Sequence, residues 1–560
     1  MKKTSTRVLV SLAITLVLGV LYFYVSLPAI NVYSQGFWFL LLLGIACFTV
    51  IYVLLSIKNA PVSSKEKKLF NFEGKKVAKI SLGIVAVPIL VLILGNLFSS
   101  TFFNAEAYSK VIEVPKAVFE EDMPESEIVS NIALMDSETA QKMGDRTLGK
   151  LDESSVVSQY VINHNYSQIN YKKAPQKVSN LEYADFFKWM NNSANGIPGY
   201  VMVDPVNFTD AKYVKLDKPM KYADSAYFGE YLRRALRMSY PTKIFGSCSF
   251  EIDDNGNPYY IVSCMSPKVF MFGAMDVSEV IIFDPITGNS DIYDLKSVPS
   301  WVDNVFTGTL ASEKYDWYGT LKNGFWNSVI GNKDCVVTTD DYGYIMIEDD
   351  VWFFTGVTSV VADESNIGFI ISNARTGEYK FYSVTGAEEY SAMKAAEGQV
   401  QEKGYVASFP SLVNVSGEAT YIMVLKDSGG LVKLYALVNV DSYHIVATGS
   451  TQTEAKREYV KLLKQHNILS NTTDTTKPEE EQVPKVSIKV DTVRLATIDG
   501  ESFVYIGVSD GYLYKQSVSE DESVMLIKEG DDLEISYLDT DVKKIRQILE
   551  WNFKKVEEKK

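Results

Sequence analysis

The stretch Ile281-Ile-Phe-Asp-Pro-Ile-Thr-Gly-Asn-Ser-Asp-Ile-Tyr293 recurs without a gap as Ile370-Ile-Ser-Asn-Ala-Arg-Thr-Gly-Glu-Tyr-Lys-Phe-Tyr382, which is 370 − 281 = 89 residues later. A weaker third copy ends at residues 448–449. Similarity at a fixed period indicates a repeated supersecondary unit. Glycine accepts positive φ without strain, so each Thr-Gly pair is predicted to form a tight turn. The expected turn residues are Thr287, Gly288, Thr376, Gly377, Thr448 and Gly449.

The sequence around each copy predicts one helix followed by strands. Before the first copy, residues 226–240 have helical periodicity and Pro241 ends the helix. Residues 243–253 then alternate apolar and polar, and Asp254-Asn-Gly-Asn257 predicts a hairpin turn into residues 258–265. The last strand of this copy is expected within residues 280–295. A helix on a small antiparallel sheet is a stable α+β layer, which is the predicted fold class.

The other two copies are predicted in the same order. The middle copy opens with helical, aromatic-rich sequence at 301–330, and the third with a helix at 387–403. The expected strands of the middle copy are 335–339, 344–348, 351–357 and 368–382, and those of the third are 405–415, 420–426 and 432–440.

The helix–strand–strand–strand order, with a last strand that ends in (Val/Ile)-x-(Asp/Asn)-x-x-Thr-Gly, resembles the PepSY family of extracytoplasmic modules. The residues that carry this resemblance are 282–288 and 371–377, with 446–449 less close. It covers roughly residues 222–466, under half of the chain, and the middle unit departs from it by a long helical insert and an acidic hairpin. The resemblance implies non-catalytic modules that bind or inhibit peptidases.

The repeat and the composition of the sequence on either side of it predict the domain layout. The expected parts are 1–99 (three transmembrane helices with a cytoplasmic Lys-rich loop at 58–79), 100–221 (membrane-proximal α+β region), 222–297, 298–386 and 387–466 (three PepSY-like units), 467–484 (a solvated linker) and 485–560. The last part has short strands separated by turn residues, which predicts a small barrel of SH3 or OB type closed by a charged helix at 541–556.

Three apolar runs at 8–30, 36–57 and 80–98 are each close to the ~20 residues that cross a bilayer. Lysine and arginine lie before the first run and between the second and third, whereas the gap between the first two carries no charge. Positive segments stay in the cytoplasm, so three crossings would leave residues 99–560 outside the cell. We therefore expect a multi-pass cell-membrane protein, in contact with the lipid bilayer, with a large extracytoplasmic region.

Charge excludes nucleic acid as a partner. Residues 1–99 carry ten Lys or Arg and two Glu, a charge of +8, so the remainder carries −15 − 8 = −23. Such an acidic body would repel phosphates. It fits an envelope protein whose partner is another envelope or membrane protein; the sequence does not define the oligomeric state.

No catalytic, cofactor-binding or metal-binding residue is predicted, and no cofactor. His164, His444 and His466 are isolated in sequence, and no zinc, nucleophile-elbow or phosphate-loop motif is present. Paired aspartates sit at expected turns, where Asp bonds its own backbone. Cys248 and Cys264 flank the 254–257 turn; a longer loop would place them close enough for a disulfide, and two free thiols are the alternative we favour.

Two aromatic clusters are candidate contact surfaces. The first, within a helix expected at 181–191, contains Phe186, Phe187, Trp189 and Met190, and we expect it to be core. The second is a candidate binding patch, for which core packing is again the alternative; its residues are Tyr315, Trp317, Tyr318, Phe325 and Trp326.

These observations favour a non-enzymatic, membrane-anchored protein of a bacterial cell of the Gram-positive type. The first hypothesis is a binding or regulatory region that modulates a peptidase or a membrane-protein partner, by adding an extended segment to a sheet edge. The second is a structural spacer in an envelope assembly, and the third an unrecognised hydrolase. A pocket of buried carboxylates would favour the hydrolase, whereas an exposed sheet edge or apolar patch would favour binding.

Overall fold

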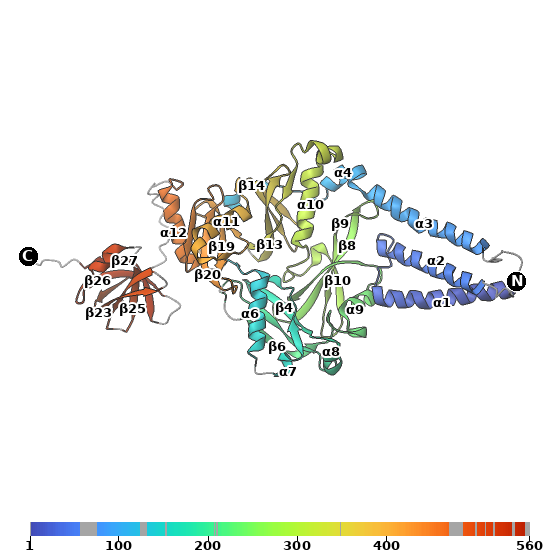
Figure 1. Cartoon of the computed structure of the whole chain (residues 1–560), viewed down its shortest axis with the longest axis horizontal. Coiled ribbons are helices and arrows are strands. Elements are labelled where there is room, and N and C mark those ends of the chain that lie inside the picture. The colour runs from blue at the N-terminus through green and yellow to red at the C-terminus, as the bar shows by residue number, and fades with distance from the viewer. Residues whose placement is uncertain are drawn as a thin grey trace, which may run out of the picture. The chain divides into compact units, whose positions relative to one another are not determined.

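The computed structural model describes residues 2–56, 75–123, 132–151, 154–206, 208, 211–347, 349–469, 485–498, 501–509, 511–518, 521–539 and 544–554. Residues 58–74 of the Lys-rich loop and 470–484 of the linker lie outside this part of the chain. The chain forms two compact units, Met1–Leu469 and Ser470–Lys560. It is a mixed α+β protein with apolar N-terminal helices and several antiparallel sheets (Figure 1).

The N-terminal helices are α1 (Lys2–Ser26), α2 (Gln35–Ser56), α3 (Lys75–Ser99) and α4 (Thr101–Ser109). Among the described residues, two stretches are long and apolar enough to cross a membrane, Ser5–Ser26 and Gln35–Leu55. A third span requires α3 and α4 to count together, because they meet at a bend of 50°. The chain therefore has two candidate membrane helices, and the structure does not confirm the expected third crossing.

The membrane-proximal region is built on a five-stranded sheet. Strands β4 (Ala174–Tyr183), β5 (Ile197–Val203) and β6 (Lys212–Met220) are antiparallel neighbours; β2 (Tyr160–Ile162) and β3 (Ser167–Tyr171) both pair with β4. Its helices are α6 (Ser137–Gly149), α7 (Ser154–Val157) and α8 (Phe186–Asn192). The helix expected from residue 181 begins only at Phe186, because β4 continues to Tyr183 and Asp185 caps the helix by accepting from Lys188 N.

The first hairpin region is a four-stranded antiparallel sheet in the order β10-β9-β8-β7. Its strands are β7 (Ile244–Ile252), β8 (Pro258–Val269), β9 (Gly273–Phe283) and β10 (Ser290–Asp294). The helix expected at 226–240 is shorter than predicted: a 3-10 turn η2 (Phe228–Glu230) precedes α9 (Leu232–Ser239). One face packs on the membrane-proximal sheet and the other on residues 298–306.

The second hairpin region has a seven-stranded sheet that also recruits a distant segment. Its core order is β1-β15-β14-β13-β11, and β12 and β16 pair with β13 and β14. The strands are β1 (Lys116–Ala117), β11 (Val336–Thr338), β12 (Gly343–Ile347), β13 (Asp350–Ser359), β14 (Ala362–Asn373), β15 (Tyr379–Tyr382) and β16 (Gly386–Ala387). The helical elements near it are α5 (Phe119–Asp122), α10 (Gly308–Leu321) and a π turn η4 (Asn327–Gly331). The single strand expected at 368–382 is therefore two strands joined by a turn.

The third region has a five-stranded sheet and two helices. Its strands are β17 (Val406–Ala407), β18 (Ser411–Val415), β19 (Glu418–Lys426), β20 (Val432–Asn439) and β21 (Val446–Gly449), and its helices are α11 (Glu389–Gln399) and α12 (Gln452–Gln465). The turn expected at Thr448-Gly449 is wrong: both residues lie in β21, opposite Ala436 and Tyr435.

The C-terminal unit is an open sheet rather than the expected barrel. Its six strands follow the order β22-β26-β27-β25-β24-β23, and no pairing between β22 and β23 closes it within the described residues. The strands are β22 (Lys485–Lys489), β23 (Thr492–Ile498), β24 (Glu501–Gly507), β25 (Leu513–Ser517), β26 (Asp532–Asp539) and β27 (Ile545–Phe553). The helix expected at 541–556 is wrong, because β27 pairs with both β26 and β25 there.

Candidate functional site

Two hairpins, β9–β10 and β14–β15, have the same register at a constant offset. Ile292 lies opposite Ile281 in the first, and Phe381 lies opposite Ile370 in the second. Each pair is shifted by 89 residues from the other (381 − 292 = 89; 370 − 281 = 89). The strands therefore present corresponding residues at their outer edges.

The turns of the two hairpins are built by the same hydrogen bonds. In the first, the carboxylate of Asp284 accepts from the N–H groups of Ile286 and Thr287 at 2.8 and 3.3 Å, and Gly288 N donates to Asp284 O at 2.9 Å. Gly288 has a φ of +80°, which a Cβ would oppose.

In the second hairpin, the side chain of Asn373 takes the place of this aspartate. It accepts from Arg375 N and Thr376 N at 2.9 Å each, and Gly377 N donates to Asn373 O at 2.9 Å. Gly377 has a φ of +74°. An Asp or Asn three residues before Thr therefore accounts for the turn in both copies.

The outer edges of the two hairpins differ. On the second, β1 adds to β15 in parallel register, with Lys116 opposite Phe381 and Ala117 opposite Tyr382. The N–H of Phe381 donates to the carbonyl of Pro115 at 3.0 Å. A segment more than 250 residues away in sequence thus extends this sheet by one strand (382 − 117 = 265).

On the first hairpin, the corresponding strand β10 is the end of its sheet. Asp284 N donates to Asn289 O, so these two residues form a hydrogen-bonded pair. Because hydrogen-bonded and non-hydrogen-bonded pairs alternate in an antiparallel ladder, the N–H and C=O of Ile292 point away from β9. Asp291, Ile292 and Asp294 are exposed. This edge, β10 with Ile292 at its centre, is the candidate functional site.

Several other sheet edges in the first unit are protected. Strand β6 carries exposed Lys212, Lys215 and Lys218, and charged edge residues, lysine above all, oppose strand addition. Strand β21 packs against α12, and β11 packs against α10. The edge of β10 has exposed aspartates instead, which oppose a second acidic strand but not a basic one.

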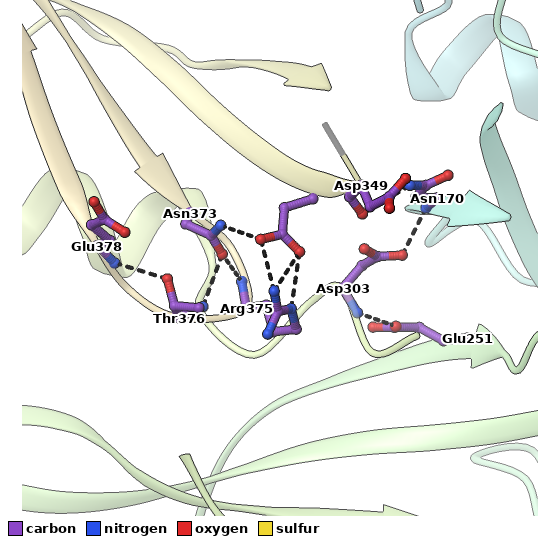
Figure 2. A network of polar contacts seen from close by, with 9 residues as sticks. Asn170, Glu251, Asp303, Asp349, Asn373, Arg375, Thr376 and Glu378 are labelled. Carbon is purple, nitrogen blue, oxygen red and sulfur yellow. Dashed lines mark hydrogen bonds and ion pairs between the residues drawn. The ribbon is translucent and has the colours of Figure 1, made fainter. Parts of the chain in front are cut away.

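A largely buried polar network joins the first and second hairpin regions (Figure 2). Asp350 binds the guanidinium of Arg375 through both carboxylate oxygens at 2.7 and 2.8 Å, and Asn373 donates to it at 2.7 Å. Figure 2 shows Asp303 between this pair and Glu251. Residues from β7, β13 and the β14–β15 turn therefore meet at one junction.

The junction contains two carboxylates that solvent does not reach. Glu251 and Asp303 are 0% and 1% exposed. Glu251 accepts from Asp303 N at 2.8 Å and Asn304 N at 3.0 Å, and Asp303 accepts from Asn170 N at 2.7 Å. Burial raises the pKa of Glu251; burial, and then the charge of Glu251, raise the pKa of Asp303 well above its usual value.

These carboxylates hold backbone amides and have no exposed surface for a substrate, so they serve to fix the junction. General acid–base catalysis requires the carboxyl to reach the proton that it transfers, which closed packing prevents here. In the described part of the chain, no group of three or more His, Cys, Asp or Glu side chains is placed to hold a metal ion.

The predicted binding patch divides into buried and exposed parts. Tyr315 is buried, and Trp317 packs edge-on against Tyr108 at 5.1 Å. Tyr318 packs on Tyr315 at 5.7 Å. Phe325 is half-buried and Trp326 is 64% exposed; both contact Phe102, which follows α3.

Sequence reasoning missed both the role of β1 and the exposure of α8. Residues 116–117 form a strand too short for a periodic pattern, and its partner is distant in sequence. The cluster on α8 was expected to be core, but Phe187 is 66% exposed and Met190 53%. Polar Lys188 and Asn191 within the helix were the available signal.

The predicted cysteine geometry also differs from the structure. Cys248 lies opposite Val262, and Cys264 opposite Phe245 across a bulge. Both are free thiols. The turn between their strands, which includes Gly256 at φ +82°, is longer than a two-residue loop, and this moves the register.

Comparison with known proteins yields no match: neither a protein-family model nor a curated protein sequence matches this chain. The resemblance to PepSY modules therefore stays an expectation from sequence.

Proposed function

We propose that this chain is a membrane-anchored envelope protein that binds an extended, basic segment of another envelope or membrane protein along β10. In this proposal the region after α3 is extracytoplasmic, because the lysines lie on the opposite side of the membrane helices. The two candidate membrane helices support the anchoring.

The main support for this proposal is the pairing of β1 with β15. The protein itself adds an extended segment to this edge in one hairpin and leaves the corresponding residue of the other, Ile292, exposed; the carbonyl of Ser290, at the start of β10, accepts from the Tyr240 hydroxyl. In strand addition, main-chain hydrogen bonds supply affinity, and alternate side chains supply specificity. Ile292 corresponds to Phe381, whose N–H donates to the carbonyl of Pro115. The N–H of Ile292 is therefore the donor that a carbonyl of a bound segment would accept from.

Charge restricts the occupant of this edge. Exposed Asp291 and Asp294 flank Ile292, and the region after residue 99 carries the excess of acid calculated above. Two copies of β10 would bring aspartates together, which is unfavourable, whereas a lysine- or arginine-containing segment would pair with them.

The resemblance to PepSY modules supports a peptidase as one form of this partner, and a membrane protein as the other. A spacer would not need an exposed edge that corresponds to an occupied one. A hydrolase would need accessible catalytic groups, and Glu251 and Asp303, the paired carboxylates of the junction, are buried.

A photo-crosslinking amino acid in place of Lys296 tests the function directly. Lys296 is exposed and follows β10, so it would lie beside a bound segment. In intact cells this position should form an adduct with one protein, and the crosslinked peptide should be extended and basic. The same crosslinker at exposed Leu431 is the control. No adduct, or the same adducts from both positions, would contradict the proposal.

A further inference from the structure

The ends of the membrane helices are fixed to the folded body by hydrogen bonds. Arg237, which is 5% exposed, donates to the carbonyl of Leu27 at 2.9 Å. Ile30 N donates to Pro241 O at 2.8 Å, and the side chain of Asn31 donates to Thr242 O at 2.9 Å. These contacts hold the C-terminal end of α1 against the folded body, beside α9 (Figure 1).

The end of α3 is held in the same way on a different element. The hydroxyl of Ser99 accepts from Met271 N and Phe272 N at 3.2 and 2.9 Å, at the tip of the β8–β9 hairpin. Tyr108 donates to the carbonyl of Ser99 at 2.7 Å. The ring of Phe272 lies against Gly95, so this hairpin tip reaches alongside the apolar helix itself.

Exposed apolar side chains surround the end of α1. Arg234 donates to the carbonyls of both Tyr24 and Phe228, and its guanidinium stacks on the Tyr24 ring at 4.0 Å. Phe228 is 59% exposed and packs on Trp189 of α8 at 5.6 Å. We call Phe187, Trp189 and Phe228 the α8 patch.

A second group surrounds the end of α3. Phe270, at the hairpin tip, packs on Phe98 of α3 at 5.9 Å, and Phe102 packs on Trp326 at 5.9 Å. Phe270, Trp326 and Ile330 are exposed. We call these three residues the η4 patch.

We infer that the α8 patch and the η4 patch insert into the lipid bilayer that contains α1 and α2, seating the body on the membrane surface. Each patch touches the end of an apolar helix, and the surroundings of such a helix at that level are the headgroup and upper acyl region. Aromatic rings with a polar handle favour that region, and Trp189 and Trp326 are of this type. A protein partner that binds beside the molecule would cover one of its sides, whereas these patches lie at the ends of two helices, α1 and α3.

Bromolipid quenching of tryptophan tests this inference without an unknown partner. Full-length protein is reconstituted in vesicles of phosphatidylcholine and phosphatidylglycerol, with or without bromine in the upper acyl chains. The contribution of residue 326 is the difference between the native protein and Trp326→Phe, and that of residue 187 is the gain from Phe187→Trp. Leu431→Trp is the control, because Leu431 is exposed and lies between β19 and β20, two strands that are apart from α1 and α2 (Figure 1).

We expect brominated lipid to remove most of the fluorescence contributed by positions 187 and 326 and to leave position 431 unchanged. Trp38, within α2, is the internal standard for correct insertion. If positions 187 and 326 are quenched no more than position 431 while Trp38 is quenched, the patches do not enter lipid. They would then be free for a protein partner, and the inference would be overturned. This outcome does not depend on whether β10 binds a segment.

Discussion

Ile292 and Phe381 lie at the same position of two hairpins in identical register, yet among the described residues only Phe381 has a strand beyond it. Phe381 donates its N–H to Pro115, and the N–H of Ile292 points out of the sheet. One molecule therefore contains both an occupied and an exposed form of the same edge. This relationship is the basis of the proposed function.

Replacing Arg237 by Ala should destabilise the first unit strongly. Its guanidinium donates to four carbonyls, those of Leu27, Tyr240, Pro241 and Lys243. Burying these acceptors without a donor should cost about 3 kcal/mol, seen as a lower melting temperature in detergent. Arg233→Ala is the matched control, because its partner Asp224 is partly exposed and the pair should contribute at most about 1 kcal/mol. Equal losses for both variants would contradict this assignment.

Gly288→Ala should destabilise the protein more than Gly229→Ala does. Gly288 has a φ of +80°, and a Cβ would lie 2.6 Å from the Tyr222 ring, whereas a Cβ at Gly229 meets nothing within 4 Å. The strained conformation and the contact together should cost about 2 kcal/mol in unfolding measurements. A melting temperature for Gly288→Ala equal to that of Gly229→Ala would show that the turn is not held as described.

In the Asp303→Asn variant, the free energy of unfolding should fall less steeply than in the native protein as pH rises. The folded-state pKa of Asp303 is raised by burial and by Glu251, with Arg375 opposing. A raised acid contributes stability that is complete below its unfolded pKa of about 4 and is lost as pH rises through the folded pKa. The amide has no charge to bury, so the variant should be more stable than the native protein at alkaline pH and lose that advantage near pH 4.

Other carboxyl groups also make the free energy of unfolding depend on pH, so the substitution should reduce this dependence without abolishing it. Burial raises the pKa of Glu389 to about 7 and that of Asp316 to about 6, with the same sign. Burial acts on Asp136 as well, but hydrogen bonds from Lys426 and Thr139 outweigh it and lower the pKa of Asp136, which therefore contributes with the opposite sign. An unchanged pH profile for Asp303→Asn would show that the buried pair does not titrate in this range.

Cysteines at Ser64 and Thr473 should differ in reaction with a membrane-impermeant reagent on intact cells. The lysine asymmetry predicts that residue 64 is cytoplasmic and residue 473 is outside, so only the second should react above the native protein. Reaction of residue 64 alone, or of both, would reject the proposed orientation.

Local pattern predicted the elements whose cause is local. The apolar runs became α1 and α2, and the turn predicted at residues 254–257 joins β7 to β8. Thr451 caps the start of α12, where its hydroxyl accepts from Glu454 N. Each depends on contacts within a few residues.

Patterns failed where only part of a motif is present, or where pairing with a distant strand decides the structure. Thr448-Gly449 lacks the Asp or Asn that accepts the turn N–H groups in the other copies, because Ile445 stands three residues before the threonine. Its backbone therefore pairs with β20. In β27, pairing with two strands overrides a charged sequence that resembles a helix. The occupied edge of β15 was not predictable, because β1 has only two residues.

The most direct measurement of the central claim compares Ile292→Pro with Ile292→Ala in the chain that carries the crosslinker at position 296. Proline lacks the N–H, and an edge strand tolerates it where that group faces outward, so the fold should be kept. Alanine keeps the N–H and removes most of the side chain. Strand addition along β10 predicts that the proline variant loses the adduct and the alanine variant retains it, at equal melting temperatures. An adduct that survives proline, or one that is lost equally with alanine, would contradict binding through the backbone of β10.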